Sequence, residues 1–597
     1  MLIQPRATLF GIGGHLGRSW PHGLRRAFGS LAERMLALDR MDALYRSLPA
    51  DATPGEFLDA AVARLGVSTD ITGPGLGVVP ERGPTIIVAN HPFGGLDGIL
   101  LAQLLLKRRS DIRILANQYL SRIAELKSLF IGVEVFGGTG AKTANMLALR
   151  QAIRWVREGG LLAIFPAGEV SHWHLQAGSV LDLAWPESVA RIVRTCAAPV
   201  VPVFFQGANS FAFQLSGLVH PRLRTALLPR ELLNKSCRVI SIAFGRVIEP
   251  VRLAAIDGDE NLAAHLRLQT YALAASLSNG RGAHRWYAHA VDAAMSPDLL
   301  EADVRAIVSM QRLGTAGRLQ VMVASARHLP HVLPEIGRLR ELTFRQVGEG
   351  TGRTSDLDLY DEYYQHLFVW NSETREIVGA YRLGLTDQIV ARRGMRGLYT
   401  RTLFDFGKSF IDQINPALEL GRSFIQPDYQ RSYAPLLLLW KGIAEYVVRH
   451  PRYAVLFGAV SISNDYHPFS RDFLMRFLGR EHYAADLARL VRARHPVHRA
   501  KGLSTLIEPW DGPKTLESLA ELLTDLETDG KGVPVLIRQY LKLGGKMVGF
   551  NVDPAFSNSV DCLVVVDLRS TDPRTLEKYM GKVGARRFLV AHPRQAA

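Results

Sequence analysis

The stretch from Thr85 to Leu106, TIIVANHPFGGLDGILLAQLLL, constrains the fold of this chain more than any other. It begins with the small or apolar residues Ile86–Ala89, passes through a turn with two adjacent glycines, and ends in an apolar segment of helical length. Such an apolar run is typical of a strand buried on both faces, and glycines permit the backbone of a tight turn. The stretch therefore predicts a strand, a turn and a helix, the unit from which parallel sheets are built.

A histidine and a carboxylate flank the glycine turn. His91 follows the expected strand, and Asp97 stands where the expected helix begins. A carboxylate beside an imidazole holds it in one tautomer and near neutral pKa, which suits a general base. A single histidine before a glycine turn is also common for structural reasons, so its role depends on what else lies at that edge of the sheet.

Length and charge bound the rest of the chain. Its 597 residues are too many for one core, and about two to four domains are expected. The 71 basic and 56 acidic residues give a net charge of +15, which favours nucleic acid, an anionic lipid surface or an acidic protein as partner.

Cysteine usage and hydropathy indicate the compartment. Three widely separated cysteines form no disulfide framework, which indicates a reducing environment. No apolar run reaches the roughly 18 residues of a spanning helix, and no signal peptide is recognisable. A cytoplasmic protein that meets membranes only from their surface is expected.

Residues 1–66 form an amphipathic N-terminal region. Apolar side chains recur at steps of three and four from Leu24 to Leu48, with arginines off this stripe. Such a helix either lies in an anionic membrane interface or packs on the next domain, and the pattern leaves both open. Proline and glycine end the pattern before a short helix, Glu56–Leu65.

Strand-like and helix-like segments alternate between residues 67 and 275, which predicts an α/β domain with a largely parallel sheet. Ligands bind at the carboxyl ends of such strands, where His91 and Phe165 fall. The expected strands are Thr85–Ala89, Ile112–Ala116, Leu161–Phe165, Val200–Phe205 and Val239–Ile242, and the expected helices are Gly98–Lys107, Ala144–Glu158 and Pro186–Cys196.

A polar stretch over residues 276–300 predicts a linker, after which residues 301–597 form a second domain of α+β type. No internal repeat relates the two halves, so the second half is expected to fold differently from the first. Its expected strands are Leu319–Ala324, Leu367–Trp370, Ile377–Leu383, Ala454–Val460 and Cys562–Val566, and its clearest helix is Ala434–Arg449.

Two more polar blocks follow strands of the first domain. FPAGEVS, residues 165–171, and VPVFFQGANS, residues 201–210, both place polar side chains at carboxyl ends of strands. His172 and His174 alternate as zinc ligands on a strand do, but no third ligand accompanies them and no metal is expected.

Together these three blocks resemble the glycerolipid O-acyltransferases of the lysophosphatidate-acyltransferase type. That family has a His and an Asp separated by four residues, a Phe-Pro-Glu-Gly-Thr-like turn and a Val-Pro-Val-like strand. Here five residues separate His91 from Asp97, and Ala-Gly-Glu-Val replaces the phosphate-associated Glu-Gly-Thr-Arg. Both departures match the hemolysin-like branch, which contains the O-acyltransferases of ornithine-lipid synthesis, and HPRLRTALLPRELLNK, residues 220–235, is also similar to that branch.

The resemblance implies a mechanism. His91 removes the proton from an acceptor hydroxyl as that oxygen attacks an acyl thioester, and Asp97 orients the imidazole. Loss of the phosphate-associated arginine disfavours a lysophosphatidate acceptor, and a phosphate-free lyso-lipid fits better. The residues implied to shape the acceptor site are Asn90, Phe93, Gly94, Gly168, Glu169, Ser171 and Asn209.

Residues 340–431 carry a second polar set, in which acids and arginines flank strand-like segments. This indicates an ion-pair network that either lines a cleft or is structural. The pattern resembles the fold shared by GNAT enzymes and autoinducer synthases, and is closer still to the N-acyltransferases that make lyso-ornithine lipid. The resemblance implies that Glu419 is a base or positions water, and that the cleft is shaped by Arg340, Asp358, Asp361, Arg382 and Arg422.

The acyl donor is indicated by a missing loop. The segment after Pro427, DYQRSYAP, lacks the glycine-rich loop whose backbone amides hold coenzyme A in GNAT enzymes. Acyl carrier protein is therefore the implied donor, with no further cofactor. That carrier is strongly acidic, so a chain of charge +15 would attract it.

Nearly the whole chain resembles the bifunctional bacterial ornithine-lipid synthases. The resemblance implies that the second half N-acylates ornithine with a 3-hydroxyacyl group and that the first half then O-acylates the 3-hydroxyl of that acyl group. It also implies a peripheral location at the cytoplasmic face of the inner membrane. Alternatives are the same chemistry on glutamine, glycine or lysine, a lysophospholipid acyltransferase with a regulatory second half, or a non-enzymatic membrane-binding or lytic protein. No nucleic-acid-binding motif accompanies the charge, so nucleic acid is not an expected partner.

Overall fold

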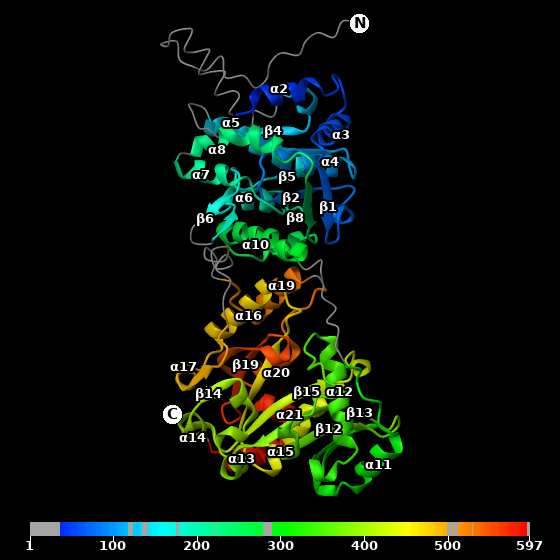
Figure 1. Ribbon diagram of the computed structural model, residues 1–597. Helices are drawn as coiled ribbons and strands as arrows, with labels where there is room; N and C mark the ends of the chain where they lie inside the picture. The colour runs from blue at the N-terminus through cyan, green and yellow to red at the C-terminus, as the bar shows by residue number, and fades with distance from the viewer. Residues whose placement is uncertain are drawn as a thin grey trace. The chain divides into compact units, whose positions relative to one another are not determined.

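The computed structural model describes residues 36–117, 123–133, 141–174, 178–219, 221–278, 289–497, 506, 512–527 and 529–593. The chain divides into two compact units, each described here by itself (Figure 1). Unit 1 comprises Met1–Gly282 with Arg499–Gly512, and unit 2 comprises Ala283–His498 with Pro513–Ala597.

The N-terminal region is described only in part. Residues 24–35 of the expected amphipathic helix lie outside the described residues, and the part that follows forms α2 (Leu38–Arg46). The next helix, α3 (Pro54–Leu65), begins at a capping box in which Thr53 and Glu56 satisfy each other's backbone N–H groups. None of the described helices combines the length and apolarity that crossing a bilayer requires.

Unit 1 is built on a seven-stranded sheet in the order β1-β9-β8-β2-β5-β3-β4. The strand predicted before His91, β2 (Thr85–Ala89), is fully buried and pairs in parallel with both of its neighbours. The other strands are β1 (Ser68–Thr72), β3 (Ile112–Asn117), β4 (Phe130–Val133), β5 (Leu161–Ile164), β8 (Val200–Phe205) and β9 (Val239–Phe244). Only the β8–β9 pair is antiparallel among the described strand pairs of this sheet, so the α/β fold with a largely parallel sheet is confirmed.

Helices cover both faces of this sheet. Successive side chains of β2 point to opposite faces, and all of them are apolar or small and buried, so each face needs a covering layer. Ile87 and Ala89 pack in one core with α3 and α4, whereas Ile86 and Val88 pack in a second core with α5, α6 and α10. The bounds are α4 (Gly95–Leu106), α5 (Ala141–Arg157), α6 (Glu187–Cys196), α7 (Phe211–Val219), α8 (Pro221–Leu233), α9 (Pro250–Ala254) and α10 (Asp259–Ser278).

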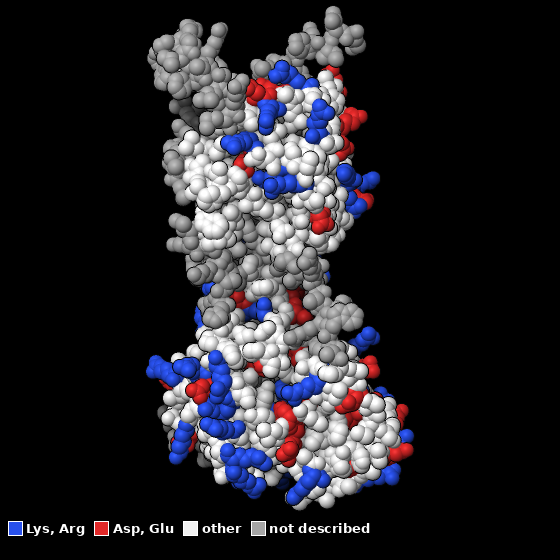
Figure 2. Space-filling view, viewed as in Figure 1, with Lys and Arg blue, Asp and Glu red and all other residues white. Residues whose placement is uncertain are grey.

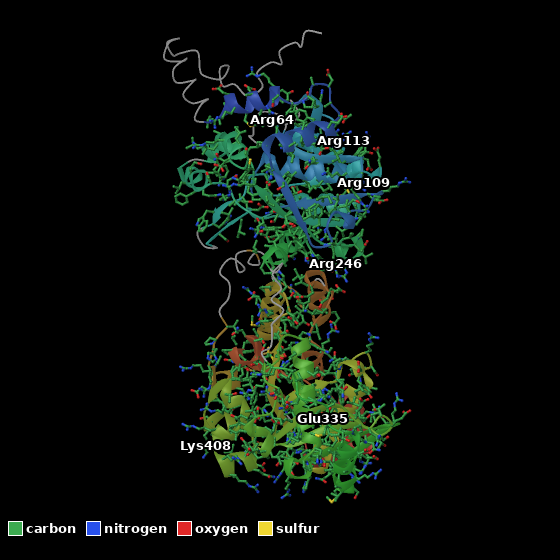
Figure 3. The ribbon with its side chains drawn as sticks, turned by 45° about the vertical axis from the view of Figure 1, so that its right-hand side comes forward. Arg64, Arg109, Arg113, Arg246, Glu335 and Lys408 are labelled. Carbon is green, nitrogen blue, oxygen red and sulfur yellow. The ribbon has the colours of Figure 1, made fainter. Side chains whose placement is uncertain are left out.

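A buried arginine ties together the amino ends of the central strands. Arg109, labelled in Figure 3, donates to Asp111 at 2.7 Å, to the Gly83 carbonyl at 3.0 Å and to the Gly159 carbonyl at 2.9 Å. These residues precede β3, β2 and β5, so the clamp lies at the edge of the sheet opposite to His91. One edge is thus occupied by structural hydrogen bonds, and the other is available for chemistry.

Unit 2 is built on an eight-stranded sheet in the order β10-β11-β12-β13-β15-β16-β19-β18. The five predicted strands are present, and α15 (Ala434–Arg449) has the predicted bounds. The strands are β10 (Arg312–Ala316), β11 (Leu319–Ser325), β12 (Gln365–Asn371), β13 (Glu376–Leu385), β15 (Ala417–Ile425), β16 (Val455–Ile462), β18 (Lys546–Asp553) and β19 (Ser559–Asp567).

The β15–β16 pair distinguishes this sheet. It is parallel while the other pairs are antiparallel, and its register runs only from Ala417–Val455 to Glu419–Phe457. Beyond that point the two strands are no longer paired, and a cavity is lined by Leu420–Ser423 from one strand and Ala459–Ser461 from the other. The sheet therefore opens at its centre.

Helices cover both faces of this second sheet. α12 (Val332–Gln346) packs with Met322 and Phe368 on one face, whereas Gly442 of α15 approaches Val321 and Leu367 on the other. The remaining longer helices are α11 (Pro297–Ala306), α13 (Thr386–Arg393), α14 (Lys408–Ile414), α16 (Pro468–Glu481), α19 (Leu516–Leu526), α20 (Val535–Lys542) and α21 (Pro573–Ala591).

Candidate active sites

The His91 and Asp97 side chains meet at the carboxyl end of β2. Nδ1 of His91 is 3.0 Å from Oδ2 of Asp97, which lies in the first turn of α4. That oxygen also accepts the backbone N–H groups of Phe93 at 2.9 Å and Gly94 at 3.0 Å. The carboxylate is fully buried, while the His91 side chain keeps 19% of its exposure. The imidazole is therefore held by a buried carboxylate on its Nδ1 side and is partly accessible to solvent.

Burial and hydrogen bonding act in opposite directions on Asp97. Burial raises the pKa of this carboxyl above its ordinary value, against the hydrogen bonds from His91, Phe93 and Gly94. These three contacts hold the carboxylate beside the imidazole, and its role of orienting the ring stays a prediction.

The glycine turn permits this approach. Gly94 has φ +82°, and a Cβ there would lie 2.9 Å from a methyl group of Leu228. Phe93 is buried in the core beneath the turn, with the Lys235 ammonium 5.4 Å from its ring centroid. The Phe165 ring lies 4.4 Å from the His91 ring, so FPAGEVS stands beside the histidine as predicted.

Asp182 holds the backbone of this site and was not predicted. Its Oδ1 accepts the Ser171 hydroxyl at 2.5 Å and the His91 N–H at 3.3 Å, and its Oδ2 accepts the Trp185 indole N–H at 3.1 Å. Ser171 in turn donates its N–H to the His91 carbonyl at 2.9 Å. The one signal in the sequence is a single acid inside the apolar run SVLDLAW, residues 179–185.

Three of the predicted substrate residues are engaged in local structure. Asn90 donates to the Phe205 carbonyl at 3.0 Å and accepts the Phe205 N–H at 2.7 Å, which joins β2 to β8. Glu169 accepts from Arg224 at 2.9 Å, and Gly168 has φ +70° in the turn after β5. The predicted contacts of these three residues to the acceptor stay predictions.

Asn209 differs from them. Its side chain is buried after β8, and neither amide atom has a hydrogen-bond partner among the described residues. A buried amide without partners is costly unless a ligand or water satisfies it. Asn209 is therefore the strongest candidate for a polar contact to the acceptor.

His172 and His174 lie on the short strand β6 (His172–His174), which pairs with β7 (Ser179–Leu181), and their rings stack at 5.0 Å. Burial lowers the pKa of both imidazoles. Within the described ranges, no three His, Cys, Asp or Glu side chains are grouped so that they could hold a metal ion.

The predicted charged residues of unit 2 form one buried network. Arg340 makes two hydrogen bonds of 2.9 Å to Asp361, and Arg382 donates to Asp358 at 2.6 Å. Nε of Arg422 lies 3.2 Å from Asp356, an acid that was not singled out in the sequence. Burial favours protonation of Asp361, but the Arg340 guanidinium holds the pKa of that carboxyl well below its ordinary value.

Glu419 is placed beside this network but enclosed. Its oxygens accept from the Tyr364 hydroxyl, from Thr400 N at 2.6 Å and from Tyr399 N at 3.2 Å. It is fully buried and does not line the cavity between β15 and β16. These hydrogen bonds fix the position of the Glu419 carboxylate. Its predicted role as a base stays a prediction.

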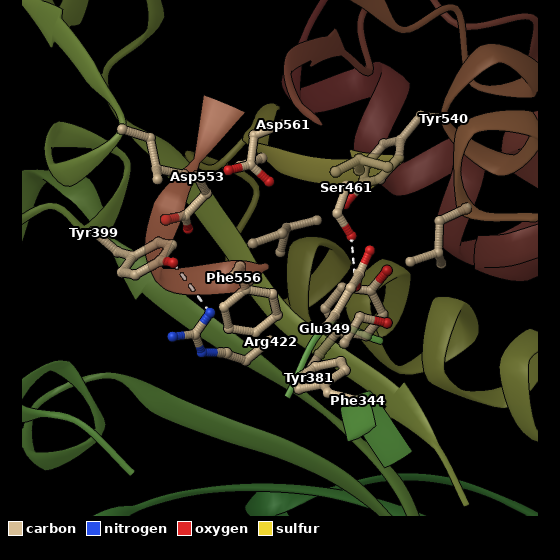
Figure 4. A pocket seen from close by; sticks show the side chains of 17 residues that line it. Phe344, Glu349, Tyr381, Tyr399, Arg422, Ser461, Tyr540, Asp553, Phe556 and Asp561 are labelled. Carbon is tan, nitrogen blue, oxygen red and sulfur yellow. Dashed lines mark hydrogen bonds between the residues drawn. The ribbon is translucent and has the colours of Figure 1, made fainter. Parts of the chain in front are cut away.

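The cavity itself is lined by acids that the sequence did not reveal (Figure 4). Glu349, Asp553 and Asp561 face it together with Arg422. Burial raises the pKa of Glu349 to about 7, with Asp465 and Asp553 adding to the rise while Ser461 and Arg422 oppose it. A carboxyl that titrates near neutrality in a cleft is suited to proton transfer.

Comparison with known proteins finds an acyltransferase family in each half of the chain. The family described as "Acyltransferase" matches residues 30–280, and the family described as "Acetyltransferase (GNAT) domain" matches residues 339–441. The chain is therefore an enzyme that transfers acyl groups, with a different acyltransferase domain in each half.

Curated relatives narrow the family. A glycine N(α)-acyltransferase of Bacteroides thetaiotaomicron is 32% identical over 47% of this chain and 87% of its own length. A lyso-glycine lipid O-acyltransferase of Phocaeicola vulgatus is 28% identical over 32% of this chain and 68% of its own. An L-ornithine N(α)-acyltransferase of Agrobacterium fabrum is 28% identical over 41% and 78%. The chain belongs to the acyltransferase family that includes the Bacteroides glycine enzyme.

Proposed function

We propose that this chain is a bifunctional acyltransferase that makes a phosphorus-free aminolipid. Unit 2 N-acylates an amino acid, with ornithine as the proposed substrate, using a 3-hydroxyacyl group from acyl carrier protein. Unit 1 then O-acylates the 3-hydroxyl of that lyso-lipid. The observation that carries this proposal is that one chain matches relatives named for N-acylation and a relative named for O-acylation.

In unit 1 the lyso-lipid hydroxyl attacks the thioester carbonyl while His91 takes its proton. The carbon–sulfur bond then breaks, and the proton passes from His91 to the leaving thiolate. Asp97, 3.0 Å from Nδ1, orients the ring and stabilises its charged form during this step. The buried, unpaired amide of Asn209 supplies a polar contact to the acceptor.

In unit 2 the amino-acid α-amine attacks a second thioester at the cavity between β15 and β16. Glu349 accepts the amine proton, because it faces the cavity and titrates near neutrality. The carbon–sulfur bond breaks as the amide bond forms, and the proton passes from Glu349 to the leaving thiolate. The arginine–aspartate network beneath the cavity positions β15 and its Arg422. Glu419 acts through this scaffold in the proposal, since its oxygens are already occupied.

A basic surface on unit 2 supports acyl carrier protein as donor. Figure 2 shows blue side chains gathered over the part of unit 2 that Figure 1 labels α13, α14 and α17 (Ala485–Ala488). Exposed arginines there, which we call the basic patch, are Arg392, Arg393, Arg396, Arg489, Arg492 and Arg494. A patch of this sign attracts an acidic carrier and steers its approach.

An apolar surface on unit 1 supports peripheral contact with lipid. Trp173 of β6 and Phe211 and Leu215 of α7 are exposed, Phe211 by 77%, and Figure 2 shows uncharged atoms where Figure 1 labels these elements. Both elements follow strands that end at the same edge of the sheet as the His91 site, and exposed apolar side chains of this kind are suited to contact with lipid.

Glycine is the second candidate for the amino acid. The observation that favours it is the higher identity to the glycine enzyme, 32% against 28% for the ornithine enzyme. The chemistry at the acyl thioester is the same for both substrates.

Expression in a bacterium that lacks aminolipids, with lipid extracts analysed by mass spectrometry, tests the proposal. The wild-type chain should yield a diacylated aminolipid, and the mass identifies the amino acid. His91→Ala should leave the N-acylated intermediate to accumulate, and Glu349→Gln should lower both lipids. Diacylated lipid at wild-type levels from His91→Ala would refute the role of His91.

A further inference from the structure

Three carboxylates face the cavity of unit 2 from a loop and two strands. Glu349 follows α12, Asp553 ends β18, and Asp561 lies within β19 (Figure 4). Arg422 is the one arginine among the residues that line this cavity. None of the three acids belongs to the arginine–aspartate network described above.

The strand register brings these acids together. Asp561 lies directly opposite Ser461 across β16 and β19, and the Ser461 hydroxyl donates to Glu349 at 3.0 Å. Asp553 pairs with Ser559, two positions from Asp561, so both aspartates are on the same face of the β18–β19 hairpin. Diagonal neighbours of this kind are about 7–8 Å apart. One small group bound between them would reach both.

The residues that the structure describes do not balance the negative charge of the cavity. Asp561 is only 6% exposed, and its Oδ2 has no hydrogen-bond partner among the described residues. The Arg422 guanidinium is already shared with Asp356 at 3.2 Å and Asp358 at 3.6 Å. Buried carboxylates without a partner are costly, and a bound cation would remove that cost.

The direction of the Asp561 pKa also indicates an excess of negative charge in the cavity. Burial raises the pKa of Asp561 well above its ordinary value, and the charges of Asp553 and Glu349 raise it further. An ammonium group placed among these acids would act in the opposite direction.

We propose that Asp561 and Asp553 bind the side-chain ammonium of the amino-acid substrate, so that unit 2 selects a diamino acid. The inference rests on the N-acylation proposed above. The α-amine must be neutral when it attacks the thioester, so the permanent cation has to come from a second amino group. Ornithine and lysine carry one, whereas glycine and glutamine do not.

Parallel reactions of the purified full-length chain with two different amino acids test this inference. Each reaction contains 3-hydroxyacyl-acyl carrier protein with ornithine or with norvaline, which has the same carbon chain without the terminal amine. Mass spectrometry of the N-acylated products gives kcat/KM for each. We expect ornithine to exceed norvaline by about 10- to 100-fold, the value of one charged hydrogen-bonded contact.

Two cavity variants and one control complete the test. Asp561→Asn and Asp553→Asn should each reduce the ratio of ornithine to norvaline efficiency by about 10-fold or more. Asp486→Asn, a control on an aspartate whose side chain is 97% exposed, should keep the wild-type ratio. The second cavity variant keeps the test decisive if the first does not fold.

The outcomes separate this inference from the proposed function. Equal efficiency with norvaline and ornithine, a preference for glycine, or an unchanged ratio in both cavity variants would overturn the diamino-acid subsite while leaving N-acylation standing. No acylation of any amino acid by the wild-type chain would remove the proposed function, and the subsite with it.

Discussion

At the scale of single residues, burial and local hydrogen bonds decide what each acid can do. Asp97 is sealed behind His91, and Glu419 is enclosed by Tyr364, Tyr399 and Thr400. Glu349 faces a cavity and accepts one hydroxyl. In the proposed function the first two acids therefore orient other groups, while the third exchanges a proton.

Replacing Asp97 with asparagine tests its orienting role. Asp97→Asn keeps the size of the side chain but no longer stabilises a protonated imidazole, so O-acylation should fall by about 10²- to 10⁴-fold. Acyl transfer to a purified lyso-lipid measures the loss. Asp70→Asn, on the exposed side of β1, is the control and should keep wild-type activity. A loss of less than about 3-fold for Asp97→Asn would contradict the role.

The pH profile of N-acylation tests Glu349. Only the ionised carboxylate accepts the amine proton, and burial raises the pKa of Glu349 to about 7, with Ser461, Arg422, Asp465 and Asp553 around it. The rate should therefore rise with pH and level off above about 7. Glu349→Gln should lower the rate and remove this rise. A pH profile unchanged in shape by the substitution would show that another group titrates.

The same carboxyl affects stability with a defined sign. Its folded-state pKa of about 7 lies above the ordinary 4.5, so the folded protein holds a proton that the unfolded chain releases. This stabilisation is present below pH 4.5 and is lost as pH rises through about 7. Urea unfolding at several pH values should show that Glu349→Gln flattens the decline. An equal slope in both proteins would contradict the raised pKa.

At the scale of elements, the first site lies where two paired strands end side by side, and the second lies where two strands separate. β2 and β8 end side by side, and Asn90 extends their ladder by two side-chain hydrogen bonds to Phe205. β15 and β16 pair over three residues and then part, which leaves the cavity of unit 2 between them. Pairing builds the first site, and the loss of pairing builds the second.

Removing the Asn90 amide tests this link. Asn90→Ala leaves the buried N–H and carbonyl of Phe205 without their partners, so the free energy of unfolding should fall by about 2–3 kcal/mol. Thermal and denaturant unfolding measure the change. Asn234→Ala, on an exposed position after α8, should change it by less than about 0.5 kcal/mol. A stable Asn90→Ala that loses only affinity for the acceptor would favour the predicted substrate contact instead.

At the scale of the whole molecule, two units with their own cores carry two acyltransferase domains on one chain. The net charge of +15 is a property of the whole chain, and the basic patch is one place where it gathers. In the proposed function, linking the two activities raises the effective concentration of the amphipathic intermediate for the second step.

Salt dependence tests the electrostatic part of the proposal. The kcat/KM of N-acylation with acyl carrier protein should fall by about 10-fold as salt rises to physiological strength, because exposed charges are screened. The triple variant Arg392→Glu, Arg393→Glu and Arg396→Glu in the basic patch should reduce this kcat/KM. The control variant Arg574→Glu, Arg586→Glu and Arg587→Glu on α21, whose arginines are also exposed, should not. A neutral thioester without carrier protein should show neither effect. A flat salt profile with the carrier protein would remove the basic patch from the proposal.

Local pattern explains how much of the first site the sequence could predict. The apolar run of β2 and the six-position step from His91 to Asp97 depend on residues that are neighbours in the chain. Asp182 lies 91 positions from His91 and has no motif around it, so only the fold could place it there. In unit 2 the order of charged residues predicted one network, and Arg340, Asp358, Asp361, Arg382 and Arg422 do meet.

The sequence by itself determined the α/β pattern of the first half, the His91–Asp97 pair and the acids and arginines of the network, because period, spacing and chain order encode these directly. The acyltransferase class of both halves was implied by their resemblance to known families. Only the tertiary structure decided that Glu419 is enclosed and that Glu349, Asp553 and Asp561 share a cavity. Those three acids come from a loop and a late hairpin, and they meet because β16, β19 and β18 pair in one register. Pairing between strands that lie far apart in the sequence depends on the whole sheet, so no local sequence pattern predicts it.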